Sequence, residues 1–299
     1  MEIKVNKGIR IAPRRWPQSM EFSRLGSELN VKEPILSAGN GQNFGSGAIK
    51  LDSAQLMDKI LQALDEHKPL SVVSVGATEA FVMAQYTIYS EEEFMGHREA
   101  FNANLGERSG FFHRGVSFPN RQARDDAVEA ARKADIVGYN TIVREARDLA
   151  EQVFHAHNIH LHYIFEANIR RVFMFSQPQK FYTMLRNRKI FLIGSLAPDA
   201  RHSLNLKLKD RLNFDIVGAI PIYAYEEIPL VKEEIKNYDF DLCILAAGTN
   251  ALILAPYIAE TYQKVAFDIG WGMQSLITGE VVHDMWIDEV IGLENLLQM

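Results

Sequence analysis

The sequence has few of the features that mark secreted or membrane-embedded proteins. Its 299 residues include a single cysteine, Cys243, so no disulfide can form within the chain. No apolar run approaches the roughly 20 residues that a membrane-spanning helix needs. The N-terminal segment also lacks the apolar centre of a secretory signal. These absences predict a soluble protein of the reducing cytoplasm.

The chain also lacks an excess of positive charge. It has 32 Lys and Arg residues against 38 Asp and Glu residues, which gives a net charge of −6 at pH 7. A protein with this balance has no general attraction for a phosphate backbone. The basic pairs Arg14-Arg15 and Arg170-Arg171 are too short for a nucleic-acid-binding stripe, and we interpret them as solvated faces or single phosphate clamps. We therefore expect no nucleic-acid partner.

Several common catalytic motifs are missing as well. There is no Gly-x-Ser-x-Gly nucleophile elbow, no Walker lysine after a glycine loop, and no Gly-x-Gly-x-x-Gly opening a helix. The last absence disfavours a nicotinamide-dependent dehydrogenase.

The four histidines within residues 155–162 lie at a helix end and along a strand, a spacing that disfavours a shared metal site. Cys243 lies in an apolar strand, where burial raises the pKa of a thiol, so it is a poor nucleophile.

A regular alternation of short apolar runs and amphipathic segments begins near Leu51. We interpret residues 1–50 as a polar N-terminal extension that ends in a glycine-rich loop, because its glycines lack the spacing of a phosphate-binding loop. Residues 51–299 are expected to form one domain. Its first segment, 51–67, repeats apolar residues at the spacing of one helix face, with Asp52 or Ser53 as the N-cap.

Seven apolar runs are typical of short buried strands. They begin at residues 70, 134, 160, 189, 214, 241 and 264, and each of the first six precedes a helix-like segment. Because these runs need no polar face, they predict a mainly parallel sheet covered by helices on both sides, a Rossmann-like doubly wound α/β fold. The polar, aromatic stretch near 90–122 has a length typical of a lid, with Phe112, His113 and Arg114 as its specificity residues.

Five strand-to-helix junctions combine glycine with polar side chains. They are residues 76–79, 138–141, 194–195, 248–250 and 268–271. In open parallel sheets, ligands collect beyond the carboxyl ends of the strands, where helix N-termini present unpaired N–H groups. Capping explains each junction alone, and Asp268 could cap the following turn as readily as bind a ligand hydroxyl. Five such junctions at one sheet edge predict a ligand site.

The order of these segments resembles the GT-D glycosyltransferase fold, known from a sugar-adding domain of bacterial adhesin glycosylation. The resemblance covers roughly residues 69–280. In that family the first strand ends in Arg-Phe-Gly-Asp-Gly-Glu, whose Asp-x-Glu pair holds the divalent cation that bridges the diphosphate of a sugar nucleotide. The matching segment here is Ser74-Val75-Gly76-Ala77-Thr78-Glu79. The glycine and the glutamate are retained, whereas Ala77 replaces the aspartate and Ser74 the arginine.

The resemblance implies that the chain binds a nucleotide diphospho-sugar, such as a UDP-sugar with Mn²⁺ or Mg²⁺, and transfers the sugar to an unknown hydroxyl acceptor. It implies Glu79 as the metal ligand, with Glu79 and Asp268 as catalytic residues. Arg144 could instead supply the positive charge beside Glu79. The residues implied in nucleotide-sugar binding are Gly76, Thr78, Asn140, Arg144, Gly194, Ser195, Gly248, Thr249, Asn250 and Gly270.

Two other functions remain open at this point. The first is a non-catalytic nucleotide or sugar-nucleotide binding protein, or a scaffold, of the same fold, which fits Ala77 in place of the metal aspartate. The second is a Rossmann-like transferase that uses S-adenosylmethionine, whose ribose Asp268 would bind. The apolar stripe of residues 284–299 could bind a second copy of the chain in a homo-oligomer, but we expect it to close the core.

Overall fold

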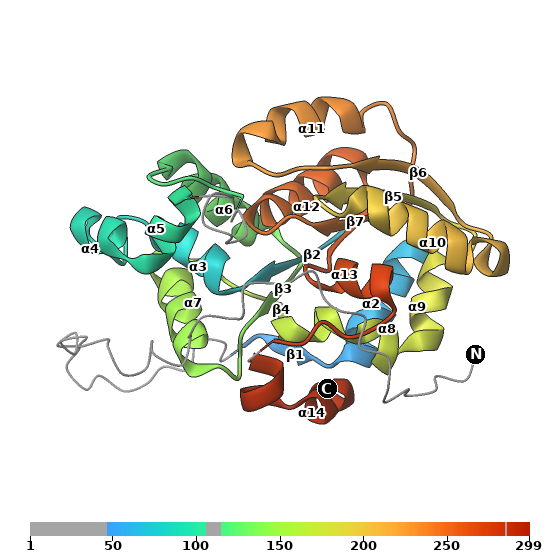
Figure 1. Cartoon of the computed structure of the whole chain (residues 1–299), viewed down its shortest axis with the longest axis horizontal. Helices are drawn as coiled ribbons and strands as arrows, with labels where there is room; N and C mark the ends of the chain where they lie inside the picture. Colours follow the sequence, from blue (N-terminus) through green and yellow to red (C-terminus); the bar gives the residue numbers. More distant parts are fainter. Residues whose placement is uncertain (1–46, 106–114, 285) are drawn as a thin grey trace. The chain divides into compact units, whose positions relative to one another are not determined.

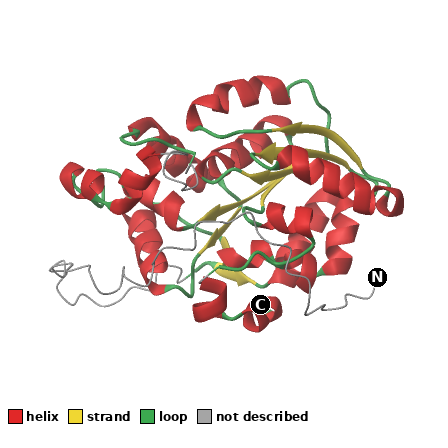
Figure 2. Ribbon diagram, in the orientation of Figure 1, coloured by secondary structure: helices red, strands yellow, loops and turns green. Residues whose placement is uncertain are grey.

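The structure is a computed structural model that describes residues 47–105, 115–284 and 286–299. Within these residues, eight parallel strands form a single sheet in the order β1-β4-β3-β2-β8-β7-β5-β6. The strands are β1 Ile49–Leu51, β2 Leu70–Val75, β3 Ile136–Tyr139, β4 Tyr163–Glu166, β5 Lys189–Gly194, β6 Asp215–Ile220, β7 Leu242–Ala246 and β8 Val265–Asp268. Helices cover both sides of the sheet (Figures 1 and 2), which confirms the predicted doubly wound α/β fold.

The helices divide into two layers, each with its own hydrophobic core. The first layer contains α3 Ala77–Ala84, α4 Glu91–Gly96, α5 Arg98–Leu105, α6 Arg121–Lys133, α7 Arg144–Ala156, η4 Tyr225–Glu227, α11 Ile228–Ile235 and α12 Thr249–Tyr262. The second contains α2 Ser53–Asp65, η3 Ala167–Arg171, α8 Phe173–Ser176, α9 Pro178–Leu185, α10 Ala197–Leu212, α13 Gly272–Thr278, η5 Trp286–Ile291 and α14 Leu293–Gln298. None of the described helices is long and apolar enough to cross a membrane.

The central strands are apolar on both faces because each face is covered. In β2, Val73 and Val75 pack into the first core, whereas Val72 packs into the second. Cys243 of β7 is fully buried in the first core, and this burial raises the pKa of its thiol. The sequence-based interpretation of Cys243 as part of a buried strand is confirmed. A continuous apolar strand is what a parallel sheet between two helix layers requires.

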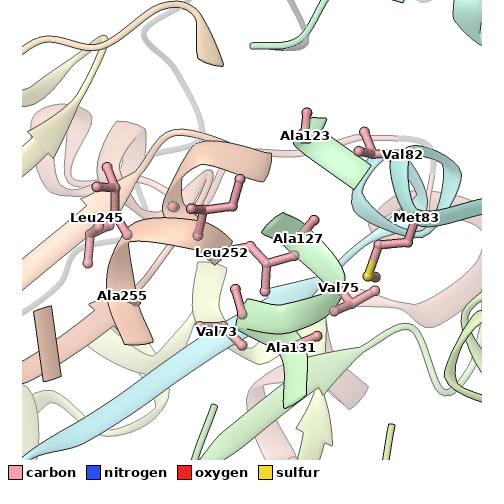
Figure 3. Packing of buried hydrophobic residues seen from close by; sticks show 14 of the residues in the cluster. Val73, Val75, Val82, Met83, Ala123, Ala127, Ala131, Leu245, Leu252 and Ala255 are labelled. Atoms are coloured by element: carbon pink, nitrogen blue, oxygen red, sulfur yellow. The ribbon is translucent and has the colours of Figure 1, made fainter. Parts of the chain in front are cut away.

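Small side chains let the helices of the first layer approach the sheet and one another. Helix α6 buries mainly alanines, and Figure 3 shows Ala127 and Ala131 among residues of the first core, together with Val73 and Val75 of β2 and Leu252 of α12. A helix lined with alanine can pack at a short interaxial distance. This close packing sets the position of α12 against β2.

The C-terminal apolar stripe closes the second core. Ile287 and Ile291 of η5 and Leu296 of α14 are buried against the second layer, and the exposed Val290 points away from it. The expectation that this stripe completes the core is confirmed. Of the two predicted N-caps of helix α2, the structure has Asp52, whose side chain accepts from the Gln55 N–H at 2.7 Å in a capping box.

Two features differ from the sequence-based expectations. The stretch 90–122, predicted as a lid, contains the helices α4 and α5. The rings of Phe94 and Phe118 are buried against Phe81 in the first core, with centroids 4.3 Å and 5.7 Å from that of Phe81. The expected lid residues Phe112, His113 and Arg114 lie outside the described residues. Strand β1, which begins at Ile49, has no counterpart among the predicted strands because it is only three residues long.

The chain reverses its direction across the sheet between β2 and β8. From β2 it continues through β3 to β4 on one side, and β8 returns beside β2 from the other half of the sheet. Helix α3 leaves β2 toward the first layer, whereas α13 follows β8 into the second layer. The carboxyl ends of β2 and β8 are therefore the topological switch point, where ligands of such sheets bind.

The close contact between β3 and β4 yields a first test. A Cβ at Gly138 would lie 2.4 Å from the Phe165 ring, so we expect Gly138→Ala to lower the free energy of unfolding by about 1–3 kcal/mol. Gly96→Ala is the matched control, because a Cβ there meets nothing within 4 Å. Urea unfolding of both variants checks the expectation, which fails if Gly138→Ala is as stable as Gly96→Ala.

Candidate functional site

Two buried carboxylates and one arginine converge at the switch point. Glu79 lies in the first turn of α3, and Asp268 is the last residue of β8; they are 6% and 2% exposed. The Arg170 side chain, 14% exposed, reaches them from η3 and donates from Nη1 to Asp268 Oδ2 at 2.5 Å. We call Glu79, Arg170 and Asp268 the carboxylate–arginine cluster.

A glycine turn shapes the space that Arg170 occupies. The Gly270 N–H donates to Asp268 Oδ1 at 2.9 Å, and Gly270 has a φ of +45°, which favours glycine. A Cβ at Gly270 would lie 2.7 Å from Arg170 Cζ, and one at Gly272 would lie 2.5 Å from the Arg170 carbonyl oxygen. Side chains at these two positions would therefore displace Arg170.

Glu79 is held by the strand end that precedes its own helix. Its Oε2 accepts from the Gly76 N–H at 2.9 Å, which caps the start of α3. A Cβ at Gly76 would lie 2.9 Å from Glu79 Oε2 and 4.0 Å from Arg170 Nη2. The guanidinium therefore lies on the same side of Gly76 as the Glu79 carboxylate.

Burial and the guanidinium act in opposite directions on the two acids. Burial raises the pKa of both Glu79 and Asp268, and the positive charge of Arg170 opposes this rise in each case. The Asp268 charge raises the pKa of Glu79 further, whereas the Gly270 N–H lowers the pKa of Asp268. The net direction is upward for both, so the cluster holds protons more strongly than exposed carboxyls do.

A hydrogen-bond network at the ends of β3 and β4 places the N-terminal side of η3. Glu166, fully buried, accepts from the Thr141 N–H and hydroxyl, each at 2.7 Å, and from Asn168 Nδ2 at 2.7 Å. Asn168 Nδ2 also donates to Asn140 Oδ1 at 3.2 Å. These bonds fasten the junctions after β3 and β4 to each other.

An ion pair holds the other end of η3. The buried Arg171 donates from Nη1 to Asp284 Oδ2, which joins η3 to the segment before η5. Burial lowers the pKa of Arg171, and the Asp284 charge opposes that change. Arg170 therefore projects from a short helix that is anchored on both sides.

The predicted binding residues fall into three groups. Gly76 and Gly270 adjoin the cluster, and Asn140 belongs to the network beside it. Thr249 and Asn250 are buried at the start of α12, where Thr249 Oγ1 and Asn250 Oδ1 have no hydrogen-bond partner among the described residues; Gly248 is the N-cap of this helix. The roles of all these residues in ligand binding stay predictions.

The third group does not reach the cluster through any described contact. Arg144, whose side chain is 81% exposed, pairs with Asp148 at 3.5 Å, so Arg170 rather than Arg144 supplies the positive charge beside Glu79. Gly194 packs against Ala246 at the end of β5, and Ser195 after it is exposed. Thr78 is half-buried on α3.

The sequence-based interpretation named Arg170-Arg171 as a solvated face or a single phosphate clamp, but did not place Arg170 among the site residues. The solvated face proposed for Arg170 and Arg171 is wrong, because both side chains are largely buried in ion pairs. The helix-like segment that follows the apolar run at residue 160 forms two short helices, η3 and α8. The available signal was the polar junction after β4, Glu166-Ala167-Asn168, which has the same character as the five junctions identified from the sequence.

The cluster does not suit a resident divalent cation. In the described parts of the chain, no three His, Cys, Asp or Glu side chains gather as metal ligands. The Arg170 guanidinium is bonded to Asp268 and its charge acts on Glu79, and the glycines of the turn leave space for the arginine side chain. A hard cation needs oxygen ligands that are open to it. The implied Mn²⁺ or Mg²⁺ ligand role of Glu79 does not fit this arrangement.

The fold and the site define a Rossmann-like α/β protein with a polar site at the switch point of a parallel sheet. A sequence model of the GT-D fold-like domain matches residues 51–276. The chain therefore belongs to the GT-D fold-like domain family, which confirms the resemblance inferred from the sequence.

Solved structures share this fold. A glycosyltransferase of domain 1792 from Streptococcus sanguinis is 15% identical, with a TM-score of 0.53 over 84% of this chain and 92% of its own. Another domain 1792 structure, described as a distinct glycosyltransferase fold, is 13% identical, with a TM-score of 0.51 over 78% of this chain and 82% of its own. A comparison with curated proteins gives no match. The likeness to these structures is one of fold.

The raised pKa values predict how stability changes with pH. An acid whose pKa is raised by folding contributes stability below its ordinary pKa, and this contribution is lost as the pH rises through the raised value. Because the pKa of Glu79 is raised from 4.5, we expect Glu79→Gln to gain stability relative to the unmodified protein as the pH increases from about 4.5 to 8. Gln retains an oxygen for the Gly76 N–H.

Urea unfolding at a series of pH values measures this difference. The control is Glu92→Gln, which removes an exposed carboxylate outside the cluster. A Glu79→Gln protein that loses relative stability as the pH rises would contradict the assigned direction.

Proposed function

We propose that this chain binds a nucleotide diphospho-sugar at the carboxyl ends of β2 and β8 and transfers the sugar to a hydroxyl acceptor. The observation that carries the proposal is the buried carboxylate–arginine cluster at the switch point of the sheet. Membership of the GT-D fold-like family, and the fold shared with a protein named as a glycosyltransferase, support the same reaction class.

The leaving diphosphate requires positive charge. Negative charge develops on the diphosphate as the bond to the sugar breaks, and fixed cations or N–H donors stabilise it. Arg170 is the cation of the cluster, and the guanidinium matches phosphate oxygens with paired N–H donors. In this proposal Arg170 faces the diphosphate, and Asp268 positions the guanidinium through its ion pair.

The acceptor hydroxyl requires a base. As the bond from the acceptor oxygen to the sugar forms, the hydroxyl proton must pass to a nearby group. Burial raises the pKa of Glu79 above its ordinary value, which makes its carboxylate a stronger base than an exposed one. We assign Glu79 as this base in place of Asp268, because both oxygens of Asp268 already accept hydrogen bonds from the protein.

The same hydrogen bonds bear on the other candidate functions. They disfavour the ribose-binding role of Asp268 that an S-adenosylmethionine-dependent transferase would require. A non-catalytic sugar-nucleotide binding protein is the second candidate, favoured by Ala77 at the position of the family aspartate. Binding without release of nucleotide distinguishes that candidate from a transferase.

Calorimetric titration with UDP and UDP-glucose tests the proposed binding. We expect micromolar affinity for both nucleotides and a loss of at least about tenfold, or 1.4 kcal/mol, in Glu79→Ala, because Glu79 supports the guanidinium that faces the diphosphate. Glu92→Ala removes an exposed glutamate and should bind as the unmodified protein does.

The reaction is followed by release of UDP from UDP-glucose in the presence of candidate hydroxyl acceptors. Binding accompanied by UDP release that Glu79→Gln abolishes supports transfer. Binding with no release under any condition supports the non-catalytic candidate. Absence of binding to both nucleotides removes the UDP-sugar proposal.

A further inference from the structure

The carboxylate–arginine cluster contains its own positive charge. Arg170 Nη1 bonds Asp268 Oδ2 at 2.5 Å, and the charges of both Arg170 and Asp268 act on the buried Glu79 carboxylate. The carboxylates come from β8 and α3, whereas the arginine comes from η3. Three separate segments thus bring one cation close to two anions.

The surrounding backbone is shaped for an arginine at this place. Gly270 lies against the guanidinium of Arg170 and Gly272 against its backbone, and a Cβ at either position would lie within 2.7 Å of an Arg170 atom. Gly76 similarly leaves space beside Glu79 and Arg170 Nη2. A side chain that entered the cluster only occasionally would not require backbone positions without a Cβ beside it.

The anchors of η3 oppose removal of Arg170. Glu166 and Asn168 hold the start of η3 through bonds of 2.7 Å, and the Arg171–Asp284 ion pair holds its end. A divalent cation between Glu79 and Asp268 would have to displace the guanidinium and break its ion pair. A guanidinium and a metal ion cannot both neutralise these two carboxylates at close range.

We propose that Arg170 is a built-in cation that replaces the divalent metal of the sugar-nucleotide site, so that the site binds its diphosphate ligand without a metal ion. The identity of the ligand rests on the proposed function. The occupation of the metal position by Arg170 does not depend on that function and can be tested with Mn²⁺ alone.

Arg170→Met provides that test. Methionine keeps most of the apolar length of the side chain and removes the charge, which leaves Glu79 and Asp268 open to a cation. We expect calorimetry and electron paramagnetic resonance to detect one Mn²⁺ site in Arg170→Met with an affinity at least about tenfold higher than in the unmodified protein. The unmodified protein should bind Mn²⁺ no more tightly than its general acidic surface does.

Arg188→Met is the matched control. The Arg188 side chain is 16% exposed and pairs with Asp65. It lies at the amino end of β5, whereas the cluster lies at the carboxyl ends of the strands. This variant loses a partly buried arginine from an ion pair without opening the cluster, so its Mn²⁺ affinity should equal that of the unmodified protein.

The folding of Arg170→Met supplies a second readout. Two unpaired buried carboxylates lower stability, so Mn²⁺ should raise the Tm of this variant, by about 5 °C at one hundred times its Kd, and leave the Tm of Arg188→Met unchanged. If Arg170→Met does not fold without metal, its recovery by Mn²⁺ supports the proposal. Failure to recover, together with no gain of Mn²⁺ affinity in Arg170→Gln, overturns it.

Mn²⁺ and UDP binding by the unmodified protein distinguish the remaining outcomes. One tightly bound Mn²⁺ in the unmodified protein, lost in Glu79→Gln, overturns the built-in cation. If UDP binds with equal affinity in EDTA and in Mn²⁺, the metal-free site is supported. If the unmodified protein binds no UDP but Arg170→Met gains affinity for Mn²⁺, the proposed function is contradicted, whereas the proposal of a built-in cation is supported.

Discussion

The ion pair between Arg170 and Asp268, next to Glu79, is the interaction on which the site depends. Burying an ionised group without a partner costs several kcal/mol, and here two acids and one base are buried together at a sheet edge. The positive charge of Arg170 offsets the negative charges of the two carboxylates, and the carboxylates hold the arginine side chain in place. The surrounding elements serve this arrangement, because the glycine turn after β8 admits the guanidinium and the Glu166 network positions η3.

The strand order explains why the cluster forms where it does. At the switch point, the connections after the adjacent strands β2 and β8 leave toward opposite helix layers through α3 and α13. The space between them is reached by η3, which follows a strand two positions away in the sheet. Within the GT-D fold-like family, this places a side-chain cation beside Glu79, where the resemblance implied a metal ion. A guanidinium carries its charge permanently, whereas a bound ion depends on its concentration and on the protonation of its ligands.

Much of the architecture follows from local sequence patterns. Continuous apolar runs such as 70–75 require cover on both faces, and the apolar spacing of 53–65 defines one buried helix face, so the parallel sheet and its helix layers could be predicted. Glu79 and Asp268 could be predicted as site residues because they lie in polar strand-to-helix junctions, where ligands of parallel sheets bind. The stretch 90–122 was harder to predict, because its polar character favoured a lid, whereas two of its aromatic residues, Phe94 and Phe118, fill the core beside Phe81.

The sequence by itself determined the fold class, the family and two of the three members of the cluster, because these depend on periodicity and on motifs within a few neighbouring residues. Only the tertiary structure decided that Arg170 joins them. Its partner Asp268 lies 98 positions away, and no local pattern specifies a contact over that separation. The contact depends on strand order and on how η3 crosses the sheet edge. The pair Arg170-Arg171 has the same sequence signature whether Arg170 faces solvent or lies beside two buried carboxylates, and only the folded environment distinguishes the two.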